Sequence, residues 1–455
     1  MQDIDRRDLV MGIAGASLLN LPVGKAQAQN AVTASRPQAM ARAQGSMLAD
    51  TVNVREFGSV GDGVADDTRA VQAALNSGAT LIVLPHGHFR VSALLVPAGV
   101  EIAGRGSLLF YKGGLLLKGN NVVRGITLKG LANSGLAHAI TISGVNGVII
   151  DGVTFVSVAQ NAVDIINSTD ILVQNCKAYD IGRYGKIDPR REGCFVHAER
   201  SSRVVISQNP LIQRTYGHAA IFIRENNTDC SVCDNAIYDT FFRGIQVYSS
   251  GIERIVVNGN RIYRTGEINN TGSGVACNGI YVVTGSRDPS LVAISHNHIE
   301  QCAENGIEVL GAATVLNNVI KFTGYRNLKT PSKEGIFVES GAIVKNNVVV
   351  SATDKGIRHF SSELTRDMVI DGNVIIDAGS DGINLQVDGK AGRYVNCRVS
   401  NNQVISHKGD WSIAVGGTNG GLVDETNVVS GNIVPYLAQT FVAKTARAFG
   451  NSWQF

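Results

Sequence analysis

A six-residue pattern recurs through most of the 455-residue chain: apolar, any, any, Asn, any, apolar. Its asparagines are Asn235, Asn260, Asn297, Asn318, Asn347, Asn373, Asn402 and Asn432, and Asn209 extends the series backwards. Successive asparagines from Asn235 onwards are separated by 25, 37, 21, 29, 26, 29 and 30 residues. Such spacings are typical of proteins built by stacking one structural unit on the next.

A second pattern, small, apolar, any, apolar, lies between these asparagines. It begins at Gly193, Ala220, Gly244, Gly279, Gly306, Gly335, Gly382 and Ser412. The apolar residues are largely β-branched and recur every second position, which predicts strands that bury one face and expose the other. Each repeat therefore contributes at least two strands.

Stacked repeats of this kind predict an all-β fold, a solenoid of about a dozen coils in which each strand pairs in parallel with its copies about 4.8 Å away. The repeated Asn suits a left-handed corner between strands, and stacked amides can hydrogen-bond along the solenoid. A propeller is the competing repeat fold, but its blades need about 40 residues or more, and these repeats are mostly shorter.

Composition agrees with a turn-rich β protein and excludes some partners. The chain has 51 Gly and only 9 Pro, and its net charge of +3 does not predict the strongly basic surface of a nucleic-acid binder. We expect the seven cysteines, including Cys230 and Cys233, to be mostly buried free thiols. We expect no obligatory metal ion and no cofactor.

The N-terminal 28 residues look like a twin-arginine signal peptide. Arg6 and Arg7 precede an apolar stretch from Leu9 to Val23, and Ala26-Gln27-Ala28 offers a small-residue cleavage site. The alternative is a membrane anchor, but the apolar stretch is too short to span a bilayer. We therefore expect export through the twin-arginine translocon to the periplasm or the medium, with residues 29–50 as a flexible leader.

Residues 51–80 form the predicted N-terminal cap of the solenoid. A short strand and a glycine-rich turn precede a helix over residues 68–76, which Asp66 and Asp67 can cap. Such a helix would cover the open end of the first coil. Residues 81–434 then form the solenoid, and residues 435–455 its C-terminal cap.

The entry segment carries a motif of the form FGxxGDGxxDDTxAxQxA. Its residues here are Phe57, Gly58, Gly61, Asp62, Gly63, Asp66, Asp67, Thr68, Ala70, Gln72 and Ala73. The motif resembles the pectate-lyase-like superfamily, which implies a right-handed parallel β-helix that handles polysaccharides as a lyase, hydrolase or epimerase. The whole chain is also similar to twin-arginine-exported, repeat-containing bacterial proteins without assigned activity.

Outward side chains of the second pattern should form two columns on one wall. We expect the first column to contain Phe195, Phe222, Gln246, Tyr281, Glu308, Phe337, Arg358 and Asn384. We expect the second to contain His197, Arg224, Tyr248, Val283, Leu310, Glu339, Phe360 and Gln386. His197, Arg224 and Tyr248 then lie on successive coils and are the predicted catalytic residues. Arg224 would neutralise a uronate carboxylate, while His197 and Tyr248 act as base and acid. The alternative is a cation stacked between two aromatic rings that stabilises adjacent coils.

Six further residues are predicted to bind the substrate. Phe195, Phe222, Tyr281 and Glu308 come from the first column, where flat aromatic rings suit the apolar faces of sugars, and Arg190 and Arg191 come from the insertion over residues 182–192. That insertion contains Tyr184-Gly185 and Asp188-Pro189-Arg190, which resembles the YGxDPH stretch of alginate C5-epimerases with Arg in place of His.

These observations predict an exported protein that binds a polysaccharide and acts on its uronate residues by elimination or C5 epimerisation. A glycoside hydrolase is the rival enzyme class, but only fragments of the hydrolase motifs occur, such as Tyr216-Gly217-His218. A non-catalytic carbohydrate-binding or envelope-structural β-helix is the alternative from a different class. The sequence makes no prediction of oligomeric state.

Overall fold

The computed structural model describes residues 50–131, 138–183, 192–249, 251, 253–267, 277–326, 333–339, 341–434, 440–442 and 446–453. The predicted signal peptide and nearly all of the predicted leader lie outside the described residues, as do Arg190 and Arg191.

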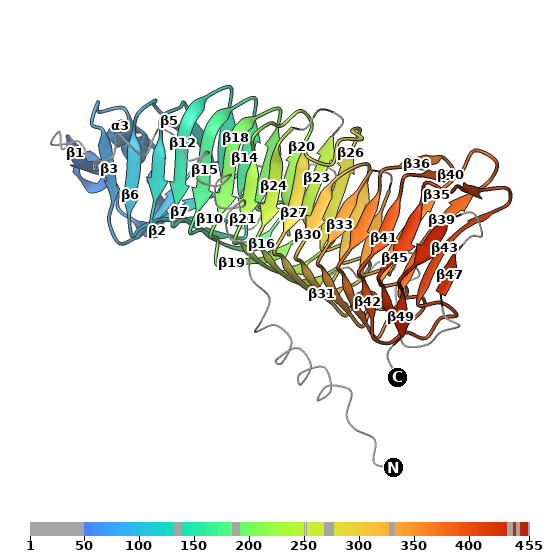
Figure 1. Cartoon of the computed structure of the whole chain (residues 1–455). Coiled ribbons are helices and arrows are strands. Elements are labelled where there is room, and N and C mark those ends of the chain that lie inside the picture. Colours follow the sequence, from blue (N-terminus) through green and yellow to red (C-terminus); the bar gives the residue numbers. More distant parts are fainter. Residues whose placement is uncertain are drawn as a thin grey trace, which may run out of the picture.

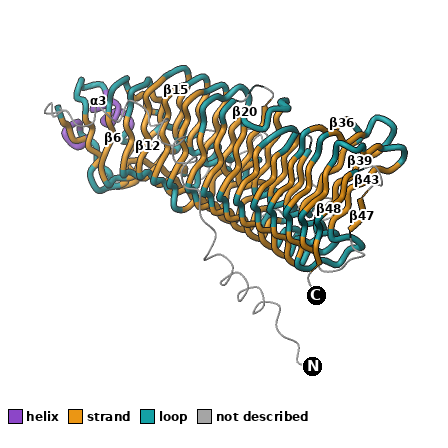
Figure 2. Tube along the Cα trace, viewed as in Figure 1, coloured by secondary structure: helices purple, strands orange, loops and turns teal. Residues whose placement is uncertain are grey.

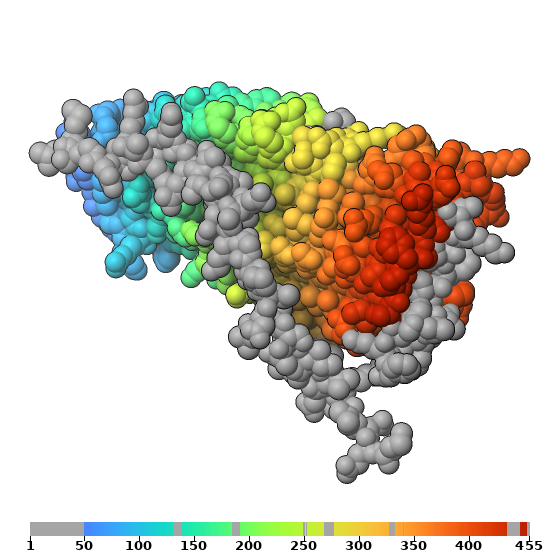
Figure 3. All heavy atoms as spheres, in the orientation of Figure 1, coloured from blue at the N-terminus to red at the C-terminus, as the bar shows by residue number. Residues whose placement is uncertain are grey.

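Three long sheets run side by side along the molecule, and each turn of the chain adds one strand to each sheet (Figures 1 and 2). Sheets A and B contain 16 strands each and sheet C contains 14. All the strand pairings between the described strands of these sheets are parallel, as in the pairing of Val257 with Ile294. The fold is the predicted right-handed parallel β-helix, with three strands in most coils and with more coils than the dozen expected. Consecutive coils form one continuous elongated body (Figure 3).

Sheets A and B pair in the following orders. Sheet A consists of β1 (Thr51–Asn53), β3 (Leu81–Leu84), β6 (Glu101–Gly104), β9 (Val122–Arg124), β12 (Asn146–Asp151), β15 (Thr169–Gln174), β18 (Ser202–Ser207), β21 (Ser231–Cys233), β24 (Ile255–Asn258), β27 (Val292–Ser295), β30 (Thr314–Leu316), β33 (Ile343–Lys345), β37 (Val369–Asp371), β41 (Arg398–Ser400), β45 (Val428–Ser430) and β48 (Arg447–Phe449). Sheet B consists of β2 (Asp62–Asp66), β4 (His88–Val91), β7 (Ser107–Phe110), β10 (Thr127–Gly130), β13 (Thr154–Val156), β16 (Lys177–Ile181), β19 (Leu211–Thr215), β22 (Ala236–Thr240), β25 (Arg261–Thr265), β28 (His298–Cys302), β31 (Val319–Lys321), β34 (Val348–Val350), β38 (Val374–Ile376), β42 (Gln403–Val404), β46 (Ile433–Val434) and β49 (Ser452–Trp453).

Sheet C forms the third wall and carries the second sequence pattern. It consists of β5 (Leu94–Val96), β8 (Leu115–Leu117), β11 (Ile140–Ser143), β14 (Val163–Ile166), β17 (Val196–Glu199), β20 (Ala219–Arg224), β23 (Arg243–Ser249), β26 (Ile280–Thr284), β29 (Ile307–Leu310), β32 (Ile336–Val338), β35 (Ile357–Ser361), β39 (Ile383–Asp388), β43 (Ile413–Thr418) and β47 (Thr440–Val442). A smaller sheet near the C-terminal end contains β36 (Leu364–Arg366), β40 (Arg393–Val395) and β44 (Leu422–Val423).

The interior of the helix is filled by columns of β-branched side chains. In sheet B, for example, Ile262, Ile299 and Ile320 are paired on successive strands and almost completely buried. Alternate residues of each strand point inward, as the period of two predicted, so neighbouring coils share one continuous apolar core.

The repeated asparagines form the predicted hydrogen-bonded column inside one corner. Asn297 Nδ2 donates to Asn318 Oδ1 at 2.9 Å, and Asn318 Nδ2 donates to Asn347 Oδ1 at 2.9 Å. The expectation that these asparagines adopt the left-handed conformation is wrong. The left-handed residue is the one before each ladder residue, such as Asn317 (φ 54°), because the corner bends there and the buried Asn then points inward to satisfy the freed backbone groups.

The N-terminal end is covered by α3 (Thr68–Leu75) and by a 3₁₀ turn, η2 (Val54–Phe57). α3 buries Val71, Ala74 and Leu75. The Asp67 carboxylate does not cap the helix through its side chain; it accepts the backbone N–H groups of Val60 at 2.6 Å and Gly61 at 3.0 Å. It therefore fixes the glycine-rich turn.

The seven cysteines are free and buried, as expected. Burial raises the pKa of the Cys230 and Cys233 thiols to about 12, so neither is a thiolate at neutral pH. Within the described ranges, no helix combines the length and the apolar character that crossing a membrane requires.

Candidate functional site

The outward face of sheet C carries two columns of side chains in the middle of the molecule. Strand pairing places Asp164, His197, Phe222, Gln246, Tyr281, Glu308, Phe337, Arg358 and Asn384 in the first column. It places Ile166, Glu199, Arg224, Tyr248, Val283 and Leu310 in the second.

The predicted register is wrong by two residues in β17. His197 pairs with Phe222 rather than with Arg224, and the residue that pairs with Arg224 is Glu199. His197, Arg224 and Tyr248 therefore share one wall but not one column. The reason is that β17 begins only at Val196, two residues later than the pattern beginning at Gly193 implies.

His197 is held by a carboxylate from the neighbouring coil. Its Nδ1 atom lies 2.9 Å from Asp164 Oδ1, 33 residues earlier in the chain. A carboxylate only accepts, so Nδ1 carries the proton and Nε2 of the neutral ring is the acceptor. Nε2 is buried, has no hydrogen-bond partner among the described residues and lies 3.8 Å from Glu199 Oε2. His197 is thus oriented as a base.

A second histidine contacts the same carboxylate. The backbone N–H of Asn161 donates to His138 Nδ1 at 3.2 Å, so His138 Nε2 carries the proton and lies 3.6 Å from Asp164 Oδ2. Burial would raise the pKa of Asp164, but the hydrogen bonds from His197 and Asn161 and the charge of His138 together lower it. Burial lowers the pKa of His138, so this ring tends to remain neutral. The arrangement keeps Asp164 ionised between two imidazoles.

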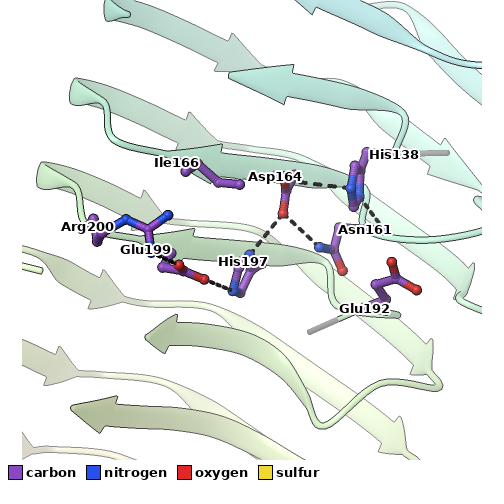
Figure 4. Close-up of a pocket in the computed structure, with 8 residues that line it drawn as sticks. All are labelled: His138, Asn161, Asp164, Ile166, Glu192, His197, Glu199 and Arg200. Carbon is purple, nitrogen blue, oxygen red and sulfur yellow. Dashed lines mark hydrogen bonds and ion pairs between the residues drawn. The ribbon is translucent and has the colours of Figure 1, made fainter. Parts of the chain in front are cut away.

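These groups line a cavity of about 210 Å³ (Figure 4). Its lining residues are His138, Asn161, Asp164, Ile166, Glu192, His197, Glu199 and Arg200. Figure 4 shows Asp164 at the centre, with dashed contacts to both histidines and to Asn161. The cavity is therefore polar and bordered by a base, carboxylates and a guanidinium group.

Arg224 and Tyr248 lie beside this cavity on the next two coils. Arg224 Nη1 is 3.7 Å from Glu199 Oε2, and Arg224 Nη2 is 2.9 Å from Glu225 Oε1. Nη1 is buried without a hydrogen-bond partner among the described residues, so it can still take an anionic ligand. Tyr248 pairs with Arg224 across the strands and is 44% exposed, which makes it the accessible hydroxyl of this wall.

Two predicted substrate contacts are wrong. Phe195 is completely buried, because it lies in the corner before β17 and packs edge-to-face on Phe155 in the core at 5.9 Å between ring centroids. Phe222 is 2% exposed and packs against the rings of His197 and His218. It supports the imidazole of His197 from the next coil instead of facing solvent.

Tyr281 and Glu308 do lie on the outward face, three and four coils beyond His197. The Arg243 guanidinium stacks on the Tyr281 ring at 4.2 Å from its centroid. Glu308 Oε2 accepts from the amides of Asn278 at 2.7 Å and Asn305 at 3.0 Å. Burial, opposed by these amides, raises the pKa of Glu308.

Sequence reasoning missed Asp164, Glu199 and His138. One available signal was Ala162-Val163-Asp164-Ile165, which repeats the small, apolar, any, apolar pattern one coil earlier and places Asp164 in the outward column. Glu199 became visible only with the corrected register. His138 had no signal, because it lies outside any strand of that pattern.

Comparison with known proteins agrees with this architecture. A family model described as a right-handed beta helix region matches residues 113–320. A second, described as rhamnogalacturonase A/epimerase, pectate lyase-like, matches residues 51–113, the segment that holds the entry motif. This chain belongs to the pectate-lyase-like superfamily.

Two curated proteins of Azotobacter vinelandii match part of this pectate-lyase-like chain. Mannuronan C5-epimerase AlgE2 is 41% identical over 66 residues, which cover 12% of this chain and 7% of that protein. Alginate lyase 7 is 41% identical over 66 residues, covering 12% and 8%. The matches thus span less than a tenth of either relative.

A solved pectate-lyase-like neighbour shares the fold over nearly the whole length. The catalytic unit of a GH87 α-1,3-glucanase from Streptomyces thermodiastaticus aligns with a TM-score of 0.52 and 14% identity, covering 88% of this chain and 71% of that one. At this identity the likeness concerns the fold alone.

Proposed function

We propose that this protein acts on a uronate-containing polysaccharide by removing the proton from C5 of a uronate residue. The observation that carries the proposal is the orientation of His197 by Asp164, which leaves Nε2 as an acceptor at the edge of a polar cavity. Arg224 and Tyr248, on the same wall, supply the cation and the hydroxyl that such chemistry needs.

The residues divide the work as follows. Arg224 Nη1 pairs with the uronate carboxylate, which makes the adjacent C5–H bond more acidic and stabilises the enolate that forms. His197 Nε2 takes the C5 proton, and Asp164 stabilises the resulting imidazolium. In elimination, the electron pair forms a C4–C5 double bond, the C4–O4 bond breaks and Tyr248 gives its proton to O4. In epimerisation, Tyr248 returns a proton to C5 from the opposite face.

The partial matches support this chemistry, because one relative is named a mannuronan C5-epimerase and another an alginate lyase. Both reactions begin by breaking the same C5–H bond. One scaffold and one base therefore serve either outcome, and the fate of the electron pair separates them.

The test is release of tritium from C5-labelled polymannuronate and polygalacturonate into water, which detects both reactions. Ultraviolet absorbance of an unsaturated product then identifies elimination. We expect H197Q to abolish release, while H298Q, on β28 of another wall, retains it. A folded wild-type protein that releases no label from any uronate polymer would contradict the proposal and leave a non-catalytic carbohydrate binder.

We also propose that the chain is exported by the twin-arginine pathway. Arg6 and Arg7, the apolar stretch behind them and the Ala26-Gln27-Ala28 site support it. Replacing both arginines by lysine should retain the protein in the cytoplasm of a producing bacterium. Unchanged export of the double variant would contradict this route.

A further inference from the structure

Beyond the cavity, the same wall changes its chemical character. Tyr281 on β26 lies three strand spacings from His197, about 14 Å along the helix axis. A polysaccharide lying along this wall therefore presents a different sugar residue there from the one that reacts at His197.

Aromatic rings follow this part of the wall. Tyr281 and Phe337 are partly exposed, Phe360 is 38% exposed, and Tyr248 continues the series toward the cavity. Phe337 is paired through β29 with Tyr281, and Phe360 lies on β35. Partly exposed rings on successive outward strands offer flat apolar surfaces of the kind that sugar rings stack upon.

The two guanidinium groups nearby are already engaged. Arg243 is 6% exposed, stacks under Tyr281, and places Nη1 3.3 Å from both His218 Nδ1 and Gln246 Oε1. Arg358 Nη1 donates to Glu334 Oε1 at 2.7 Å. Neither is presented to a ligand in the way that the unpartnered Nη1 of Arg224 is.

The polar groups that remain are carboxyl groups. Glu308 uses Oε2 for both amide hydrogen bonds, and its Oε1 accepts none from the described residues. Glu334 is fully buried, and its Oε2 has no hydrogen-bond partner in the described part of the chain. Glu339 interacts electrostatically with Glu308 and Tyr281. These groups suit sugar hydroxyls, which donate to carboxyl oxygens.

A uronate is disfavoured at this position in either charge state of Glu308. If the group is ionised, it repels the ligand carboxylate; if it is neutral, it supplies no cation to replace the lost hydration. A neutral sugar meets neither cost.

We infer that the wall around Tyr281 and Glu308 binds a neutral sugar, so that the substrate is a heteropolysaccharide carrying a neutral residue near the reacting uronate. This inference rests on the proposed function for the reacting residue, but the binding it describes does not require catalysis.

The experiment compares C5-proton release from polymannuronate and polygalacturonate with release from alternating galacturonate–rhamnose and glucuronate–glucose polymers. We expect kcat/KM to be at least tenfold higher for one of the alternating polymers. The double variant E308Q/E339Q should narrow that preference, and E300Q on β28 should leave it unchanged. Equal or higher kcat/KM on the homopolymers would overturn the inference.

A binding arm separates its failure from that of the proposed function. Neutral gluco-, manno- and galacto-hexasaccharides and a mannuronate hexamer are titrated calorimetrically into wild-type protein and into E308Q and F360S. If no polymer releases label, the proposed function fails, yet tighter binding of a neutral hexamer that weakens at least tenfold in either variant still supports the neutral-sugar site. Tighter binding of the mannuronate hexamer, or neutral binding unaffected by both variants, overturns it.

Discussion

The side-chain amide of Gln72 hydrogen-bonds to Leu95 in the place of a neighbouring strand. Gln72 Nε2 donates to the Leu95 carbonyl at 2.9 Å, and the Leu95 N–H donates to Gln72 Oε1 at 2.9 Å. Leu95 lies on β5, the first strand of sheet C, which has no preceding strand to pair with. One helix residue therefore satisfies an exposed sheet edge that would otherwise invite association with another chain.

We expect Q72A to reopen this edge. It should lower the free energy of unfolding by about 1–3 kcal/mol, because a donor and an acceptor lose their partners, and it should increase light scattering on heating. R69A, on the exposed side of the same helix, is the control and should change neither. A Q72A protein with unchanged stability and scattering would show that the amide contributes nothing to closure.

Asp164 should set the activity of His197 without binding substrate itself. D164N removes the charge that stabilises the imidazolium and the preference for the Nδ1-protonated tautomer, so we expect kcat to fall about 10²- to 10⁴-fold with little change in KM. The measurement is C5-proton release across a pH series. D170N, which loses an exposed pair with Arg203, should retain full activity, and a wild-type kcat for D164N would refute this role.

The asparagine ladder predicts unequal costs at adjacent positions. Asn318 donates to Asn347 and to the Ile294 carbonyl and accepts from Asn297, so N318A should destabilise the protein by several kcal/mol at about 1–3 kcal/mol per buried group left unpaired. N317G should be nearly neutral, because Asn317 is exposed and left-handed, and glycine stands at the equivalent corner before Asn260. Urea unfolding compares the two, and equal losses would show that the ladder is not the source of stability.

His359 should make stability depend on pH. Its ring is buried between Tyr394 Oη at 2.5 Å and Thr365 Oγ1 at 3.2 Å, and burial lowers its pKa from 6.5 to about 3. Between these values the unfolded chain binds a proton that the folded protein does not. This stabilising contribution is therefore present above pH 6.5 and is lost as pH falls toward 3, with a slope of roughly 1 kcal/mol per pH unit.

Thermal or urea unfolding from pH 7.5 to 4 measures that slope. H359Q should be less stable at pH 7.5 but should lose less stability on acidification than the wild-type protein. Parallel pH profiles for the two proteins would contradict the assignment to His359.

Much of the fold follows from local patterns. The spacing of residues such as Asn235 and Asn260 marks each coil, because every coil must present the same buried amide to the next. The alternation within Ile280-Tyr281-Val282 separates core from surface, because successive side chains of a strand point to opposite faces. These properties depend only on neighbouring residues and are readable from the sequence.

The reaction centre was decided by the tertiary structure. Asp164 and His197 meet because two strands pair in one register, and the 33 intervening residues contain a corner whose length shifts the start of β17 by two positions. The same corner turns Phe195 into the core, although its place in the pattern resembles that of an outward residue. A strand pattern repeats with period two and looks alike after such a shift, so only packing against the adjacent coil determines which base faces which carboxylate.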